Sequence, residues 1–131
     1  ECEVEDIPGY LPSNYFEGVD GYFHKRALEY VGKEDLLTGG RTFASDDVAD
    51  VSNLKPVLHF GFSGFGGSFH GADFHILDEE KAYLEPAKLV ASTVADMLTD
   101  RENLMEVINK FKPTMTKEAY IKSWLGLKAE V

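Results

Sequence analysis

The sequence predicts an α/β protein that is helix-rich with few strands and that would have an α+β appearance in isolation. Apolar residues recur at helical spacing in four or five stretches, whereas only residues 57–62 show a clear strand pattern. One or two strands do not make a self-sufficient sheet, so the predicted strand needs partners from elsewhere. The 131 residues fit one domain of ordinary size, and 44% hydrophobic residues are typical of a globular protein. We therefore expect a piece of a larger α/β domain.

The first predicted helix follows Asn14. Asn14 and Glu17 match a capping box, and Gly32 supplies a stop at the C-terminal end. The apolar face of this helix would be formed by Val19, Phe23, Ala27, Tyr30 and Val31. Gly18 and Gly21 each cost a helix roughly 1 kcal/mol relative to Ala, which indicates that close packing requires them.

A loop over residues 33–44 leads to a short second helix and then to the predicted strand. Ser45 is placed to cap a helix that begins at Asp46, where acidic side chains favour the positive end of the helix dipole. Pro56 precedes residues 57–62, whose aromatic and branched side chains predict a buried strand. Gly64, Gly66, Gly67 and Gly71 predict that the next stretch is a mobile or tightly curved loop.

A long helix is predicted over residues 79–99. Asp78 can cap it, and Pro86 either introduces a kink or marks its first turn. Its apolar stripe would be formed by Tyr83, Ala87, Val90, Ala91, Val94 and Leu98. This stripe is expected to face the core.

Two shorter helices are predicted after residue 99. Asp100 can cap the first, and Pro113 ends it. The inward-facing residues of that helix would be Leu104, Val107, Ile108 and Phe111. Thr116 is placed to open the last helix.

The formal net charge of −10 argues against several classes of partner. Nucleic acids and anionic membrane surfaces both attract basic faces, which this composition does not favour. No run of about 18 apolar residues is present, so the sequence predicts no membrane-spanning segment. Cys2 is the only cysteine, so no internal disulfide can form and a reducing compartment is allowed. We expect a cytoplasmic protein with no nucleic-acid or membrane partner.

His70 is the first candidate for chemistry. It lies in the glycine-rich loop, where an imidazole is either a solvated surface group or a metal ligand. Asp73 and His75 could join it, but their spacing is not a standard metal motif and equally fits a surface ion pair. Asp47 and Asp50 either complement the helix dipole or act as supporting carboxylates that orient a metal-bound imidazole.

Four stretches of the sequence resemble the C-terminal part of one enzyme family. Residues 8–12 resemble the segment that re-enters the catalytic domain after a lid, and residues 45–52 resemble a Gly-Ser-Thr-Asp-x-Gly-Asp-Val-Ser block. Residues 68–74 resemble the block with the last metal ligand, and residues 88–100 resemble the long helix after it. The chain thus resembles the metal-dependent amidohydrolases and exopeptidases that include aminobenzoyl-glutamate hydrolases and carboxypeptidase G.

The resemblance implies that residues 1–131 are the C-terminal portion of a zinc-exopeptidase-like catalytic domain, after the lid insertion. In such enzymes two divalent metal ions, zinc and sometimes manganese, activate a water molecule that attacks an amide carbonyl. By position, His70 would be a ligand of one ion, with Asp47 and Asp50 in supporting roles. The loop glycines beside the substrate would be Gly64, Gly66 and Gly67.

The family's other metal ligands and its general base are expected upstream, in an N-terminal part of the same polypeptide. One histidine does not make a catalytic zinc site, so we expect the isolated chain to bind no metal tightly and to hydrolyse nothing. The expected partners are that N-terminal part and a small amide substrate, such as an N-acyl amino acid or aminobenzoyl-glutamate. A second copy of the chain is a further candidate partner, in a homo-oligomer. The alternative is a free-standing, non-catalytic binding or interaction module derived from the same family.

Overall fold

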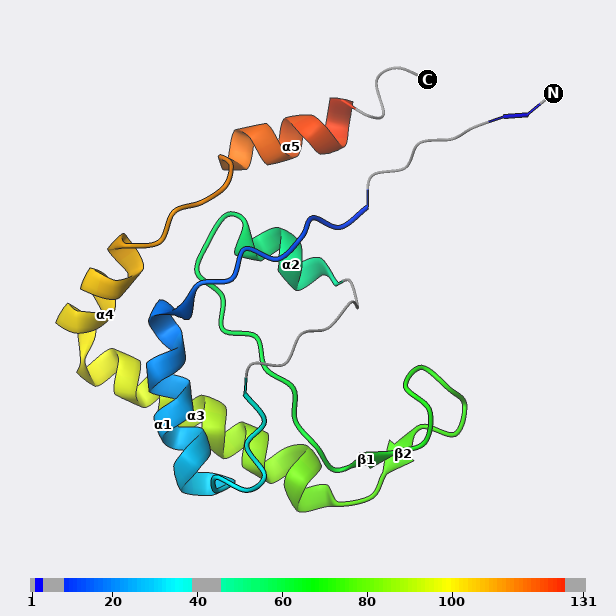
Figure 1. The fold of residues 1–131 in the computed structure, drawn as a ribbon, viewed down its shortest axis with the longest axis vertical. Helices are drawn as coiled ribbons and strands as arrows, with labels where there is room; N and C mark the ends of the chain where they lie inside the picture. Colours follow the sequence, from blue (N-terminus) through cyan, green and yellow to red (C-terminus); the bar gives the residue numbers. More distant parts are fainter. Residues whose placement is uncertain (1, 4–8, 39–45, 127–131) are drawn as a thin grey trace.

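Residues 2–3, 9–38 and 46–126 are described by the structure, which is a computed structural model (Figure 1). Helices dominate this part of the chain, and its one sheet has two strands, which confirms the helix-rich α+β expectation. The elements in chain order are η1 (Glu17–Val19), α1 (Asp20–Tyr30), α2 (Asp47–Ser52), β1 (Phe65–Gly66), β2 (His75–Ile76), η2 (Glu80–Leu84), α3 (Glu85–Thr99), α4 (Arg101–Asn109) and α5 (Lys117–Gly126).

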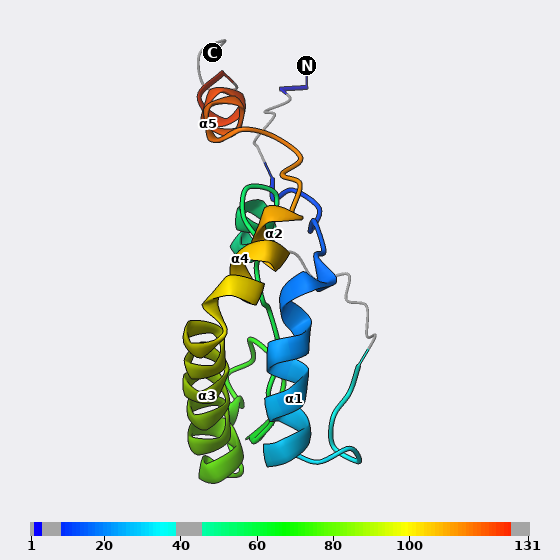
Figure 2. The same ribbon diagram turned by 90° about the vertical axis from the view of Figure 1, so that its left-hand side faces the viewer.

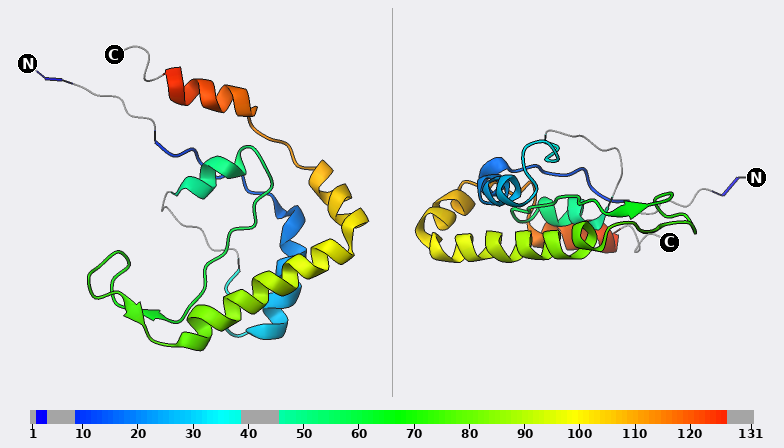
Figure 3. Two further views of the ribbon diagram at one scale, coloured as in Figure 1. Left: turned by 180° about the vertical axis from the view of Figure 1, so that it is seen from behind. Right: turned by 90° about the horizontal axis from the view of Figure 1, so that it is seen from below.

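Helices α1 and α3 lie side by side and form the main packed unit (Figure 2). The β1–β2 hairpin precedes the N-terminal end of η2 and α3, whereas α4, α2 and α5 lie toward the other end of the molecule. The elements follow an open arc and do not enclose a central core (Figure 3). No described helix is long and apolar enough to cross a lipid bilayer.

The core is small. The buried apolar residues are Val19, Ala27, Ala49, Ala82 and Leu89, and no large side chain in the described part of the chain is fully buried. The accessible surface is 10566 Å².

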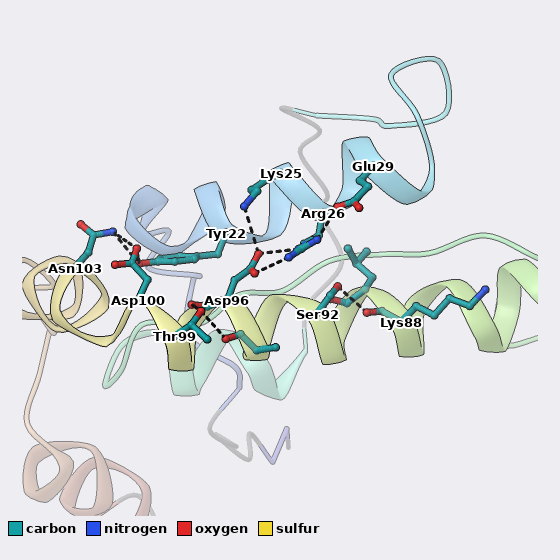
Figure 4. A network of polar contacts seen from close by, with 12 residues as sticks. Tyr22, Lys25, Arg26, Glu29, Lys88, Ser92, Asp96, Thr99, Asp100 and Asn103 are labelled. Carbon is teal, nitrogen blue, oxygen red and sulfur yellow. Dashed lines mark hydrogen bonds and ion pairs between the residues drawn. The ribbon is translucent and has the colours of Figure 1, made fainter.

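An ion pair joins α1 to α3. Arg26 donates from Nε to Asp96 Oδ2 over 2.7 Å and from Nη2 to Asp96 Oδ1 over 2.6 Å, in the fork geometry that favours Arg–carboxylate pairs (Figure 4). Arg26 also donates to Glu29 on its own helix. The hydrogen bonds from Arg26 hold the pKa of Asp96 below its ordinary value. The pair fixes the register of α1 against α3, beside the buried Ala27 and Thr93.

Acid is expected to weaken this contact. The lowered folded-state pKa of Asp96 means that its contribution to stability is complete above the ordinary value of 3.8 and is lost as the pH falls through the folded-state value. Urea unfolding of the wild-type chain and of Asp96→Asn between pH 7 and pH 2 will measure this. The wild type should lose more stability on acidification than the variant, and parallel losses would contradict the assignment.

The apolar stripe predicted for the long helix does not face the core. Its residues Tyr83, Ala87, Val90, Ala91, Val94 and Leu98 are all exposed. The face that packs against α1 is instead formed by Leu89 and Thr93, and Ala82 is buried in η2. The orientation was wrong because α3 carries apolar or small residues over more than one face, and helical spacing alone does not say which face meets a neighbour.

Several predicted helix boundaries are confirmed. Asp78 caps the long helix, since its Oδ1 accepts from the backbone N–H groups of Glu80 and Lys81. Pro86 lies in the first turn of α3, which directly follows the π-helical residues of η2, so the helix is already under way before Pro86 and changes its winding there. Thr116 accepts from the N–H of Ala119 and opens α5.

The capping box predicted at Asn14 and Glu17 is wrong. No side chain caps η1, and Asn14 instead donates from Nδ2 to the Lys112 carbonyl over 3.2 Å. Asp100 does stand at the N-cap position of α4, but its carboxylate accepts from the hydroxyl of Tyr22. In both cases a contact distant in sequence replaces the predicted local cap.

Asp46 caps α2 by accepting from the N–H of Ala49, so α2 begins at Asp47, one residue later than predicted. The predicted cap Ser45 lies outside the described residues. This side-chain hydrogen bond satisfies an amide at the helix start that no helical carbonyl can reach.

The strand predicted over residues 57–62 is also wrong as an assignment. These residues belong to no strand, and the only pairing in the described part of the chain joins Phe65–Gly66 to His75–Ile76. Phe60 packs against Phe23 of α1, with ring centroids 4.4 Å apart. The segment has the composition of a strand but lacks a described neighbour with which to form a ladder.

Close packing requires Gly18 but not Gly21. A Cβ at Gly18 would overlap the ring of Phe16 and the side chain of Val107, whereas nothing lies within 4 Å of one at Gly21. Gly21→Ala in α1 is therefore expected to raise the free energy of unfolding by about 0.5–1 kcal/mol, because Ala loses less backbone entropy in a helix. Urea unfolding will measure the change, and a destabilised variant would contradict the open space at this position.

Candidate functional site

His70 lies in the loop of the β1–β2 hairpin. The two strands pair antiparallel, with Phe65 opposite Ile76 and Gly66 opposite His75. The hairpin is anchored to the start of the long helix because the N–H groups of Leu77 and Asp78 both donate to the Gly64 carbonyl, over 2.8 and 3.1 Å. The loop between the strands is thus held at a fixed place beside η2.

Short-range hydrogen bonds define the conformation of this loop. The N–H of Gly71 donates to the Ser68 carbonyl over 2.7 Å, and that of Phe74 donates to the Gly71 carbonyl over 3.2 Å. The carboxylate of Asp73 accepts from the N–H of Ser68 over 3.2 Å. At Gly67 the backbone has φ +82, and a Cβ there would overlap the carbonyl group of Asp73. The loop therefore closes tightly on itself.

The backbone of His70 is in the left-handed region, with φ 64. It is the only non-glycine residue with positive φ in the described part of the chain, and such residues concentrate at functional sites. Its side chain is exposed and contacts Phe69 edge to face, with ring centroids 4.6 Å apart. No hydrogen bond or ion pair joins its ring to another described residue. The imidazole is therefore available to a ligand.

Aromatic rings connect this loop to the helices. Neighbouring centroids are 4.4 to 6.5 Å apart along the series Phe23, Phe60, Phe62, Phe65, Phe74 and Phe69. Contacts at such spacing each contribute about 0.5–1.5 kcal/mol beyond simple burial. The series gives the hairpin an apolar support that begins on α1 and ends next to His70.

Asp50 occupies a different environment. It is 6% exposed, and its carboxylate joins three segments of the chain. Oδ1 accepts from the N–H of Leu11 over 2.6 Å, and Oδ2 accepts from the hydroxyl of Tyr120 over 2.8 Å. The hydrogen bond to Asp50 raises the pKa of Tyr120 above its ordinary value. Asp50 thus attaches both the N-terminal segment and α5 to α2.

Two neighbours of Asp50 extend this connection. The hydroxyl of Ser52 accepts from the N–H of Asn14 over 2.9 Å and donates to the Ala49 carbonyl over 2.6 Å. Asn53 donates from Nδ2 to the Pro12 carbonyl over 2.8 Å and accepts at Oδ1 from the hydroxyl of Thr114. The sequence analysis missed these roles. The sequence does contain a signal for these roles, because three polar residues, Asp50, Ser52 and Asn53, follow Ala49 closely.

An open pocket of about 320 Å³ lies between α2 and α5. Its lining residues are Asp47, Val48, Asp50, Val51, Leu54 and Tyr120. Asp47 is exposed at its rim, whereas both oxygens of Asp50 are already engaged by Leu11 and Tyr120. The pocket therefore offers apolar contact and the exposed carboxylate of Asp47, which accepts no hydrogen bond from another described residue.

The predicted site residues do not gather at one place. Asp47 and Asp50 lie on α2, and the hairpin with His70 lies toward the other end of the molecule (Figures 1 and 2). No group of three or more His, Cys, Asp or Glu side chains that could hold a metal ion occurs among the described residues. Gly64, Gly66 and Gly67 lie at the start of the hairpin that contains His70, and their expected place beside a substrate stays a prediction. The described residues alone thus supply one imidazole and no complete metal site.

Comparisons with models of protein families, with curated proteins and with solved structures found no match.

Proposed function

We propose that this chain is the C-terminal portion of a zinc-exopeptidase-like catalytic domain that hydrolyses an amide bond in an N-acyl amino acid or an aminobenzoyl-glutamate-like substrate. In this proposal His70 supplies one ligand to one of two divalent metal ions. The remaining ligands come from an N-terminal part of the same polypeptide. The complete enzyme acts in the cytoplasm, and the chain alone is inactive.

The conformation of His70 is the observation that supports this proposal most directly. A left-handed backbone at a non-glycine residue costs of order 1–3 kcal/mol and persists only where the surrounding structure enforces it. Here the loop hydrogen bonds enforce it, and the result is an exposed imidazole without a described polar partner. A neutral imidazole with a free ring nitrogen is a preferred ligand for zinc.

The described residues fit such a metal centre only in part. A catalytic zinc ion needs about three protein ligands, and the His70 loop offers one. Asp50 accepts hydrogen bonds from Leu11 and Tyr120 at a distance from this loop. Its proposed supporting role would therefore be to hold segments of the fold together. Asp47 remains available at the pocket rim.

The metal content of the parent polypeptide tests the proposal. We expect two equivalents of zinc or manganese per chain, and His70→Ala should reduce this to one or fewer while abolishing hydrolysis of aminobenzoyl-glutamate. His24→Ala is the matched control, because His24 is exposed and lies on α1, outside the hairpin loop, and the variant should retain both ions. Full metal content in His70→Ala, or turnover by the 131-residue chain alone, would contradict the proposal.

The second candidate is a free-standing binding or interaction module without catalysis. The separation of α2, which contains Asp47 and Asp50, from the His70 hairpin favours this candidate. In such a module, α2 only connects segments of the fold. A module of this kind should unfold cooperatively and remain monomeric as the isolated chain. A portion of a catalytic domain should instead self-associate or expose apolar surface. Size-exclusion chromatography with light scattering, together with urea unfolding, separates the two.

A further inference from the structure

The pocket between α2 and α5 combines carboxylates with apolar side chains. Its volume of about 320 Å³ is at the lower end of the range for small-molecule sites, which is about 300–1,000 Å³. Four of its lining residues recur at helical spacing along α2 and the turn after it, and therefore face the same side: Asp47, Asp50, Val51 and Leu54. The two carboxylates are the only charged groups in this lining.

Asp50 is a buried carboxylate without a positive partner among the described residues. It is 6% exposed and accepts at both oxygens, as an ionised carboxylate does, from the N–H of Leu11 and the hydroxyl of Tyr120. Both donors are neutral, and each occupies only one of the two lone pairs on its oxygen. Buried charges are normally paired, because neutral donors replace only part of the hydration that burial removes. The pocket therefore contains a negative charge that no described side chain neutralises.

Asp47 adds a second carboxylate at the rim of the pocket. It is exposed and pairs with no other described residue. The ion pair described at this end of α2 joins His59 to Asp46 over 3.8 Å, and it includes neither of the lining carboxylates. The net charge of the whole chain is −10, so the surrounding field has the same sign as the pocket. The pocket therefore favours cations and disfavours anions.

The rest of the lining defines the other half of the ligand. Val48, Val51 and Leu54 contribute aliphatic surface, and Val51 is 50% exposed although it is apolar. The ring of Tyr120 comes from α5, and its hydroxyl is held by Asp50 over 2.8 Å. An aromatic ring next to carboxylates attracts an ammonium ion through its π-electrons as well as through charge. A ligand with one cationic group and an apolar body is complementary to both parts of the lining.

We infer that the pocket between α2 and α5 binds a primary ammonium ion with an apolar body. The cation lies at the carboxylates of Asp47 and Asp50, and the body contacts the aliphatic side chains and the ring of Tyr120. This inference does not rest on the proposed function, because it uses neither His70 nor a metal ion. The substrates proposed above contain carboxylates, which this pocket disfavours, so its ligand belongs to a different chemical class.

The probe for the test is 2-phenylethylammonium, which joins one ammonium group to a small aromatic body. An NMR titration of the 131-residue chain at pH 7 and low salt should give a Kd of about 1 mM or below. The amide shifts that change should be concentrated on α2 and α5. The anion 3-phenylpropionate has the same body with a carboxylate in place of the ammonium group, and it should bind at least about tenfold more weakly.

Two variants test the charge and the space of the pocket separately. Asp47→Asn keeps the shape of the rim and should weaken binding of the ammonium ion by about threefold or more. Val51→Lys should abolish measurable binding, because its own ammonium group would take the ligand's place one helical turn from Asp47. That pair also supports α2, so lost binding would not reflect lost folding. Glu102→Gln on α4 is the matched control, since it removes one exposed negative charge outside the pocket and should leave affinity unchanged.

The inference is overturned if 2-phenylethylammonium does not bind, if the shifts lie outside α2 and α5, or if 3-phenylpropionate binds as tightly. Unchanged affinity in either Asp47→Asn or Val51→Lys would overturn it as well. Circular dichroism will verify that each variant keeps its helices. These outcomes are distinct from those of the proposed function, because metal content that depends on His70 neither requires nor excludes an ammonium ion in this pocket.

Discussion

Replacing Asp50 with Ala should lower the free energy of unfolding by about 3 kcal/mol, which is more than a 100-fold change in the folding equilibrium. Asp50 is 6% exposed, and its two oxygens accept from the N–H of Leu11 and the hydroxyl of Tyr120. Truncation leaves both donors without their acceptor and disconnects the N-terminal segment and α5 from α2. Urea unfolding at pH 7, followed by circular dichroism, will measure the loss.

Asp47→Ala is the matched control, because Asp47 lies on the same helix, has the same charge and is exposed. Its loss removes only a favourable interaction with the dipole of α2, so the expected change is about 0.5 kcal/mol or less. Equal effects of the two substitutions would show that Asp50 contributes charge alone. A larger effect of Asp47→Ala would contradict the geometry of α2.

Most helices could be predicted from the sequence, because helical spacing and local caps act over a few residues. Asp78 and Thr116 were identified as caps, and both bond to amides within three residues of themselves. Asn14 could not be interpreted in the same way. Its partner, the Lys112 carbonyl, is 98 residues away in sequence, and no local pattern reveals such a contact.

The two larger errors have one physical cause. A strand exists only as part of a ladder, and residues 57–62 have no described neighbour to pair with. The exposure of the stripe that includes Val90 and Val94 similarly depends on what the rest of the molecule brings to that face. Sequence patterns indicate that a segment is suited to strand pairing or to burial. They do not indicate whether a neighbouring strand or a covering element is present, which only the structure shows.

The loop that contains His70 could be predicted from the sequence, but its conformation could not. The glycines around His70 indicated a mobile or tightly curved loop, and the loop is tightly curved. Its left-handed histidine could not be foreseen, because it arises from hydrogen bonds between Ser68, Gly71, Asp73 and Phe74 that depend on the closed loop. The role of Asp50 was missed for the opposite reason, since an acid near the start of a helix is fully explained by the dipole.

Gly67→Ala is expected to open the hairpin, at a cost of about 3 kcal/mol to its closed form. Two effects add at this position. The backbone of Gly67 has φ +82, which an L side chain rarely adopts, and a Cβ would overlap the backbone of Asp73, which cannot rotate away. The loop would therefore lose the contact between Gly67 and Asp73, and with it the enforced conformation of His70.

Hydrogen exchange at Leu77 will report this opening, since its N–H donates to the Gly64 carbonyl at the base of the hairpin. We expect at least about 100-fold faster exchange in Gly67→Ala, which follows from about 3 kcal/mol of lost local stability. Gly61→Ala is the matched control, because nothing lies within 4 Å of a Cβ there, and exchange at Leu77 should be unchanged. If the proposed function holds, Gly67→Ala in the parent polypeptide should also lower its metal content without any change at His70 itself. Retention of the metal together with a fast-exchanging hairpin would mean that the imidazole does not depend on this loop for its position.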